Sequence, residues 1–141
     1  MTTMIYSHEE KVIVVDGRCT KGHDIVSDRY NKVMKRDGLT FICAGKVADL
    51  QALVDSYPYG FEGMDELEAI AFVVDDGEVF ECTISDGDYN VCPITFNSAN
   101  GSGTPYALAA LDFGCTAKQA MKYVMTRDSA TGGKVQTIKV K

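Results

Sequence analysis

The sequence predicts an α+β domain built mainly from antiparallel strands, and three observations support this prediction. Short apolar runs come in pairs separated by turn residues, which is typical of β-hairpins. Two regions, 46–57 and 104–127, instead repeat their apolar residues with helical spacing. Strands and helices are grouped along the chain, which favours antiparallel sheets with the helices gathered outside them.

The first half of the chain is predicted to hold strands and then one helix. Its strands are expected over residues 2–6, 11–18 and 39–45, with short extended pieces over 24–38. The first two flank the turn sequence SHEE. The predicted helix over 46–57 has an apolar face that contains Val47, Leu50, Leu53 and Val54. Pro58 ends this helix because proline cannot donate the next backbone hydrogen bond.

The second half is predicted to continue with strands and to end with two helices and a last strand. The turn DDGE joins two apolar runs within residues 66–85, and residues 87–99 form a further strand region. Pro105 suits the first turn of a helix, Gly114 its end and Thr116 the N-cap of a second helix. Residues 134–140 alternate as a final strand.

Composition and length indicate one soluble domain over residues 1–141. Twenty acidic and fourteen basic residues give a net charge of −6, which argues against nucleic acid or an anionic membrane as the main partner. No apolar run has the length that a bilayer span requires, and the N-terminus lacks the features of a signal peptide. We therefore expect a cytoplasmic protein.

Five scattered cysteines, without a C-x-x-C pair, are typical of reduced thiols in the cytosol. We expect each to be a small buried apolar residue. The histidines, His8 and His23, are far from paired cysteines, so no metal site is expected.

Several short stretches contain more polar and small residues than turns require. Asp16 follows a strand, Lys32 stands among apolar and turn residues, and Gly45 separates a buried strand from a helix. The later stretches NGSGTPYALAALD and RDSATGG add small residues, hydroxyls and a carboxylate. Taken singly, each has a simpler interpretation as a turn, a solvated charge, a cap or a helix end.

Taken in order, six stretches resemble the proteasome β-subunit and HslV peptidase family of N-terminal nucleophile hydrolases. They are TTM, DGRCTKG, SDRYNK, CAGKVADLQAL, GSGTPYALAALD and RDSATGG, and they cover nearly the whole chain. The resemblance implies a four-layer α-β-β-α sandwich of two antiparallel sheets, with the active site at one end between the sheets. Only a short helical region follows Gly45, so the chain looks like a shortened member.

The resemblance also implies roles for individual residues. Thr2 would be the nucleophile, Asp16 and Lys32 the acid-lysine pair beside it, and the Gly45 N–H the donor to the oxyanion. The positions that hold the threonine amine and its water would be Ser102, Asp128 and Thr131. The residues that flank the substrate would be Cys19, Thr20, Cys43 and Val47.

The chemistry of an N-terminal threonine explains why such residues are needed. A threonine hydroxyl is a weak nucleophile until a base removes its proton, and an α-amine with a pKa near 7.7–8.0 can do so. A nearby lysine cation lowers the pKa of that amine further. The reaction would be amide hydrolysis through an acyl-enzyme ester, without a metal or organic cofactor.

The implied substrate is a peptide or unfolded protein, bound as an added strand and cleaved after apolar residues. The implied assembly is a homo-oligomer, with a ring as one arrangement and an ATP-dependent unfoldase as one partner. Thr2 would depend on removal of Met1, since no propeptide is seen before it. Two alternatives stay open: a catalytically silent structural or regulatory protein that keeps Met1, and an amidase for small amides.

Overall fold

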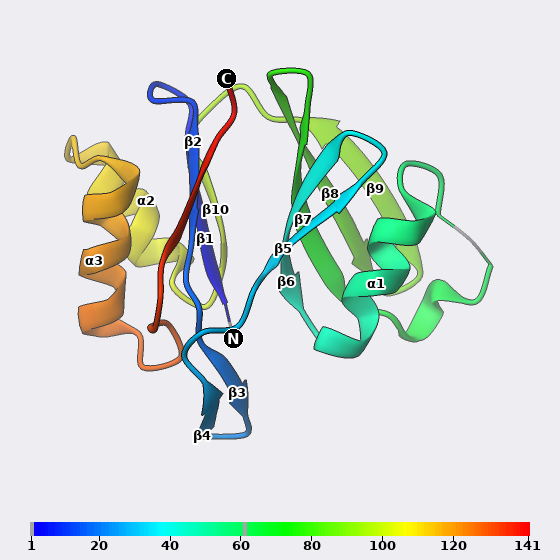
Figure 1. Ribbon diagram of the computed structural model, residues 1–141, viewed down its shortest axis with the longest axis horizontal. Coiled ribbons are helices and arrows are strands. Elements are labelled where there is room, and N and C mark those ends of the chain that lie inside the picture. Colours follow the sequence, from blue (N-terminus) through cyan, green and yellow to red (C-terminus); the bar gives the residue numbers. More distant parts are fainter. Residues whose placement is uncertain (1, 61) are drawn as a thin grey trace. The chain divides into compact units, whose positions relative to one another are not determined.

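The computed structural model describes residues 2–60 and 62–141 and divides the chain into two compact units (Figure 1). Unit 1 combines the chain up to Lys32 with Thr95–Lys141, and unit 2 is Val33–Ile94. Each unit contains an antiparallel sheet and helical segments, which confirms the predicted α+β class. That residues 1–141 form one domain stays a prediction. No helix in the described part of the chain is long and apolar enough to cross a membrane.

The main sheet of unit 1 has the strand order β10-β1-β2-β11, with each neighbouring pair antiparallel. Its strands are β1 (Thr3–Ser7), β2 (Val12–Val15), β10 (Ser98–Gly101) and β11 (Gln136–Lys139). The β1–β2 hairpin confirms the pair predicted around SHEE. Every residue of β1 is buried, so the strand that follows Thr2 is anchored along its whole length.

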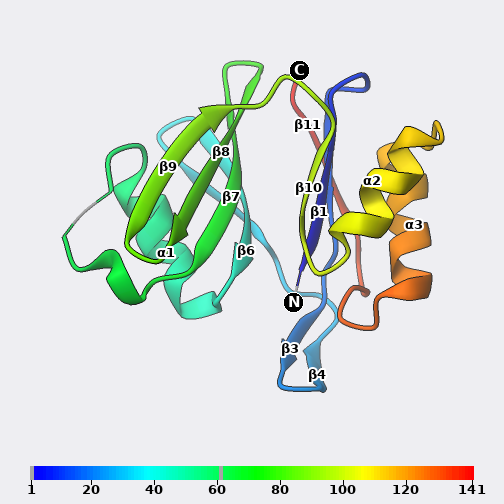
Figure 2. The same ribbon diagram turned by 180° about the vertical axis from the view of Figure 1, so that it is seen from behind.

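Helices α2 (Thr104–Asp112) and α3 (Ala117–Arg127) lie side by side against one face of this sheet (Figures 1 and 2). The core between them and the sheet includes Ile5, Val14, Ala107, Ala120, Met121 and Val124. Pro105 stands in the first turn of α2, and Gly114, with φ of +91°, follows the end of that helix. Thr116 caps α3 in a capping box, as predicted.

A small hairpin, β3 (Cys19–Lys21) and β4 (Asp24–Ser27), connects β2 to the segment that ends at Lys32 (Figure 1). This hairpin exposes Ile25 and Val26. It therefore adds little to the core of unit 1.

The sheet of unit 2 has the strand order β5-β6-β7-β8-β9. Its strands are β5 (Val33–Arg36), β6 (Leu39–Gly45), β7 (Ala69–Asp75), β8 (Glu78–Ser85) and β9 (Asp88–Pro93). Three of its hairpin turns consist of Asp followed by Gly, both with positive φ, at 37–38, 76–77 and 86–87. This is the turn geometry that matches the twist of paired strands, and DDGE predicted one of the three turns.

Helix α1 (Val47–Ser56) packs on the sheet of unit 2, and a short 3₁₀ turn, η1 (Met64–Glu66), precedes β7 (Figure 2). The buried apolar residues of α1 are Leu50, Leu53 and Val54. Val47 is 50% exposed, so the predicted apolar face is wrong at its first residue. Val47 is absent from the buried cluster that Leu50, Leu53 and Val54 form with the sheet.

Two further expectations are corrected by the structure. Residues 87–99 are not one strand region: β9 ends at Pro93 as an edge strand of unit 2, and β10 begins at Ser98 in unit 1. Proline has no N–H to continue a ladder, so the chain leaves the sheet there. Cys43 and Cys82 are buried as expected, but Cys92 is exposed on that edge strand.

Candidate active site

Thr2 immediately precedes β1, and Thr3, the first residue of that strand, lies opposite Asp16. The Thr3 amide donates to Asp16 Oδ1 at 3.1 Å, and the Asp16 amide donates to the Thr3 carbonyl at 3.3 Å. Asp16 thus extends the pairing beyond the end of β2, while its carboxylate turns back onto the backbone behind Thr2. Thr2 is itself buried.

The Asp16 carboxylate has no exposed surface and accepts hydrogen bonds from three donors. Besides the Thr3 amide, Oδ1 accepts from Lys32 Nζ at 2.6 Å, and Oδ2 accepts from the Gly132 amide at 3.0 Å. Because the lysine and the Thr3 amide share one oxygen, the ammonium lies close to the peptide bond between Thr2 and Thr3. The structure therefore brings Asp16 and Lys32 together directly behind Thr2.

Burial lowers the pKa of Lys32 below the ordinary lysine value, since surroundings of low polarity disfavour a charge. The charge of Asp16 and its hydrogen bond oppose this shift. Asp16 thus favours a cation at a place where an isolated lysine would lose its proton more readily.

Asp128 is the centre of a second cluster, at the end of α3. Its Oδ2 accepts from Ser102 Oγ at 2.5 Å and from Thr131 Oγ1 at 2.6 Å, and its Oδ1 accepts from the Ala130 amide at 3.1 Å. Burial raises the pKa of Asp128, but these three hydrogen bonds together lower it below the usual aspartate value. The three residues predicted to hold the threonine amine therefore form one hydrogen-bonded group around an ionised carboxylate.

The Thr3 side chain links this cluster to β1, a role that the sequence did not indicate. Thr3 Oγ1 accepts from the Gly103 amide at 3.0 Å and lies 2.6 Å from Thr131 Oγ1. Since Thr131 gives its hydroxyl proton to Asp128, Thr3 must be the donor in the bond between the two threonines. The hydroxyl protons of this network therefore all point toward Asp128.

Gly101 allows the backbone around Ser102 to approach Thr2 closely. The Ser102 amide donates to the Thr2 carbonyl at 3.1 Å. A Cβ at Gly101, where φ is +105°, would overlap that carbonyl oxygen. Glycine is therefore required here on both conformational and steric grounds.

Arg18, which pairs with Asp28, contacts the loop that contains Thr131 and Gly132. Arg18 Nε donates to Asp28 Oδ1 at 2.8 Å, and its Nη1 donates to the carbonyl of Ser129 at 2.9 Å. The guanidinium also covers Gly132, where a Cβ would meet it at 2.6 Å. Both residues lie in stretches on which the family resemblance rests, but no role was predicted for them. The contact of Arg18 with Ser129 joins positions 111 residues apart, which the sequence does not show.

The remaining predicted residues have different surroundings in the two units. Cys19 and Thr20 are half-buried in β3 of unit 1. In unit 2, Gly45 has φ of +123° and packs against the carbonyl of Glu68, whereas Cys43 has no exposed surface. Burial raises the pKa of the Cys43 thiol to about 12, so the thiol is unreactive at neutral pH. The roles of Gly45, Cys43 and Val47 beside Thr2 stay predictions.

The described residues, 2–60 and 62–141, contain no group of three or more His, Cys, Asp or Glu side chains that could hold a metal ion. Asp16 and Asp128 each use both carboxylate oxygens to accept hydrogen bonds from protein donors. These carboxylates therefore hold protein groups in position.

Comparisons with known proteins show similarity of fold. No model of a known protein family matches the chain, and no curated protein sequence matches it. The crystal structure of eukaryotic HslV from Trypanosoma brucei matches with a TM-score of 0.75 and 19% identity, over 96% of this chain and 97% of that one.

Thiobacillus denitrificans BPH matches with a TM-score of 0.69 and 15% identity, over 99% of this chain and 98% of that one. The same protein in complex with Epoxomicin matches with a TM-score of 0.70 and 15% identity, over the full length of both chains. At these identities the likeness concerns the fold, which is α+β with two main antiparallel sheets and is shared with HslV.

Proposed function

We propose that this chain is a threonine-type peptidase that hydrolyses peptide bonds through Thr2 after removal of Met1. Met1 lies outside the described residues. The observation that supports the proposal best is the buried Asp16 carboxylate, which joins the Lys32 ammonium to the backbone amide next to Thr2. The side chains of Lys32 and Asp16 are only 3% and 0% exposed, and burying two charges is costly, so this pair is not an ordinary surface salt bridge.

In the proposed reaction, the free α-amine of Thr2 is the base. It accepts the proton from Thr2 Oγ as that oxygen attacks the substrate carbonyl carbon, and it then gives the proton to the leaving amine as the C–N bond breaks. Water hydrolyses the resulting ester by the same exchange in reverse, which releases a carboxylate and restores the Thr2 hydroxyl. We assign the Gly45 N–H to the oxyanion on the basis of the family resemblance.

The two clusters of unit 1 support this reaction in different ways. The Lys32 cation keeps the α-amine neutral by lowering its pKa, and Asp16 keeps Lys32 charged. Ser102, Asp128 and Thr131 would position the amine and a water molecule, because they are tied to Thr2 through the Ser102 amide and to Thr3 through Thr131.

The fold likeness supports a peptide as substrate, since one similar protein is a complex with Epoxomicin. We propose that a peptide or unfolded protein lies along Cys19, Thr20, Cys43 and Val47 and is cleaved after apolar residues. A cytoplasmic homo-oligomer, a ring arrangement and an ATP-dependent unfoldase belong to the same proposal.

The test begins with the intact mass of the protein made in its own host. We expect a mass that is short by one methionine and, after treatment with Epoxomicin, modification at Thr2. Thr2→Ala should abolish the modification and leave folding intact, because the Thr2 hydroxyl is expected to face a cleft. A chain without Met1 that Epoxomicin does not modify would falsify the peptidase. A mass that includes Met1 would favour the silent structural or regulatory protein.

A further inference from the structure

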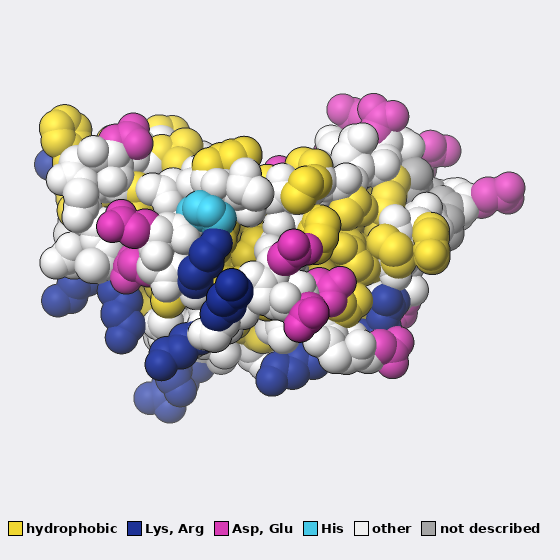
Figure 3. Space-filling model, turned by 90° about the horizontal axis from the view of Figure 1, so that it is seen from above, with side chains coloured by type: hydrophobic (Ala, Val, Ile, Leu, Met, Phe, Trp, Pro, Cys, Tyr) yellow, Lys and Arg dark blue, Asp and Glu magenta, His cyan; other side chains and the backbone are white. Residues whose placement is uncertain are grey.

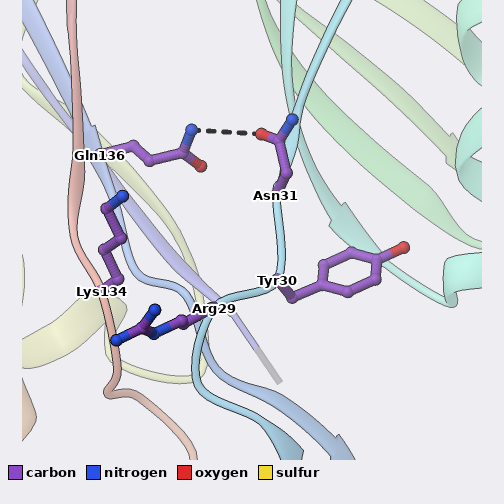
Figure 4. A pocket seen from close by; sticks show the side chains of 5 residues that line it. All are labelled: Arg29, Tyr30, Asn31, Lys134 and Gln136. Carbon is purple, nitrogen blue, oxygen red and sulfur yellow. Dashed lines mark hydrogen bonds between the residues drawn. The ribbon is translucent and has the colours of Figure 1, made fainter.

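A small polar pocket in unit 1 lies next in sequence to residues of the candidate active site. Its volume is about 130 Å³, and it is lined by Arg29, Tyr30, Asn31, Lys134 and Gln136 (Figure 4). Residues 29–31 directly precede Lys32, and residues 134–136 follow the loop that contains Thr131. In Figure 4 the Arg29 side chain extends toward the segment that bears Lys134, whereas Tyr30 points the opposite way.

The two walls of this pocket are tied to each other. The Lys134 amide donates to the carbonyl of Asp28 at 2.7 Å, and Gln136 Nε2 donates to Asn31 Oδ1 at 3.2 Å. Gly133, with φ of +76°, lets the chain pass close to Asp28, where a Cβ would collide with backbone. The pocket is therefore formed before any ligand enters it.

Two cations meet at this pocket without a carboxylate. Within residues 2–60 and 62–141, neither the Arg29 guanidinium nor the Lys134 ammonium forms an ion pair, whereas Arg18 pairs with Asp28 and Lys32 pairs with Asp16. The chain as a whole has a net charge of −6, although Figure 3 shows several basic side chains gathered on one face. Two unpaired cations at one cavity repel each other and attract an anion.

Gln136 indicates that a ligand of this pocket should also carry a hydrogen-bond donor. Its Oε1 is buried and has no hydrogen-bond partner among the described residues, while its Nε2 is occupied by Asn31. A buried carbonyl oxygen without a donor loses its hydration without compensation. A ligand that brings an N–H group would satisfy this oxygen.

We propose that the pocket binds the C-terminal residue of a peptide. Its carboxylate pairs with Arg29 and Lys134, and its amide N–H, two bonds from the carboxylate carbon, donates to Gln136 Oε1. The volume corresponds to about four water molecules, which suits a terminal carboxylate with its amide. Inorganic phosphate would match the two cations, but in its dianionic form, HPO₄²⁻, it has one O–H and no N–H group to donate to Gln136 Oε1.

This binding site goes beyond the proposed peptidase, because binding here requires no hydrolysis and no free Thr2 amine. Its failure and the failure of the proposed function are therefore distinguishable. The probes are N-acetylalanine, N-acetylalaninamide, acetate and inorganic phosphate. Each is titrated into the full chain, and binding is followed by the NMR signals of the backbone amides.

We expect N-acetylalanine to shift the signals of residues 29–31 and 134–136, with an affinity that falls as salt is added. N-acetylalaninamide should bind more weakly by a factor of at least about ten, because it lacks the negative charge of the carboxylate. The double variant Arg29→Gln with Lys134→Gln should lose binding, while Lys118→Gln with Lys122→Gln, which removes the same charge from the exposed side of α3, should keep it. Gln136→Leu should weaken binding of N-acetylalanine but not of acetate, which has no N–H.

Three outcomes would overturn the proposal. The first is equal affinity for N-acetylalanine and N-acetylalaninamide. The second is an equal loss of binding in the two double variants, which would show attraction by overall charge only. The third is tighter binding of phosphate than of N-acetylalanine, which would make the pocket a general oxyanion site.

Discussion

Lys32 Nζ and Asp16 Oδ1 lie 2.6 Å apart, and the exposed fractions of the two side chains are only 3% and 0%. Burying two charges costs hydration free energy that their attraction roughly offsets, so such a pair is weak evidence for stability. Its position is more informative, because the same carboxylate oxygen also binds the Thr3 amide. The pair and the backbone behind Thr2 therefore form one hydrogen-bonded group.

Replacement of Lys32 should test this group. Lys32→Met leaves the buried Asp16 carboxylate with only two backbone donors, and we expect the free energy of unfolding in urea to fall by about 3–5 kcal/mol. Modification by Epoxomicin should be lost as well. Lys35→Met, at an exposed position three residues later, should change the free energy of unfolding by less than about 0.5 kcal/mol. Equal losses in the two variants would contradict the role given to the pair.

The Thr3 hydroxyl should matter for stability although Thr3 performs no chemistry. Thr3→Val keeps the shape of the side chain but leaves the Gly103 amide and Thr131 Oγ1 without their partner. We expect a loss of about 1–3 kcal/mol in the free energy of unfolding. Thr3→Ser, which restores the hydroxyl, should recover most of it. A valine variant as stable as the wild type would show that the network from Thr3 to Asp128 is dispensable.

Gly101 and Gly114 form a matched pair for testing whether the close packing of the Gly101 backbone against Thr2 matters. Both have positive φ, +105° and +91°, so alanine at either position carries a similar backbone strain of about 1–2 kcal/mol. Only at Gly101 does the added Cβ overlap the Thr2 carbonyl, since nothing lies within 4 Å at Gly114.

We therefore expect Gly101→Ala to lower the midpoint of thermal unfolding more than Gly114→Ala and to slow modification by Epoxomicin. The rate of modification in Gly114→Ala should equal that of the wild type. If both variants behave alike, close packing at Gly101 does not position Thr2.

Asp128 should make stability depend on pH in the acidic range. Its pKa in the folded chain is lowered, so it contributes stability above its unfolded pKa of about 3.9, and that contribution disappears as pH falls through the lowered value. Asp128→Asn lacks this titration. The difference in free energy of unfolding between wild type and variant should therefore shrink steadily from about pH 5 to pH 2 in urea titrations. A difference that does not change with pH would contradict a lowered pKa.

Local chemistry explains why many elements could be predicted from sequence. The Asp-Gly turn at 76–77 needs two residues that tolerate positive φ, and Thr116 caps α3 through a residue three positions later. Such interactions depend on neighbours in the chain. The prediction of one strand region over 87–99 was wrong because its two halves join different sheets. Which sheet a strand joins depends on pairing partners that are far away in sequence.

The sequence by itself determined the α+β class, the hairpins, the helix caps and a set of candidate residues in a recognisable order. It could not show that Asp16 serves Lys32, Thr3 and Gly132 at once, or that Thr3 points its hydroxyl proton toward Asp128 through Thr131. Those relationships join residues that are between 13 and 128 positions apart in the sequence. Only the tertiary structure decides them, because hydrogen bonds depend on distance and direction in space and not on separation along the chain.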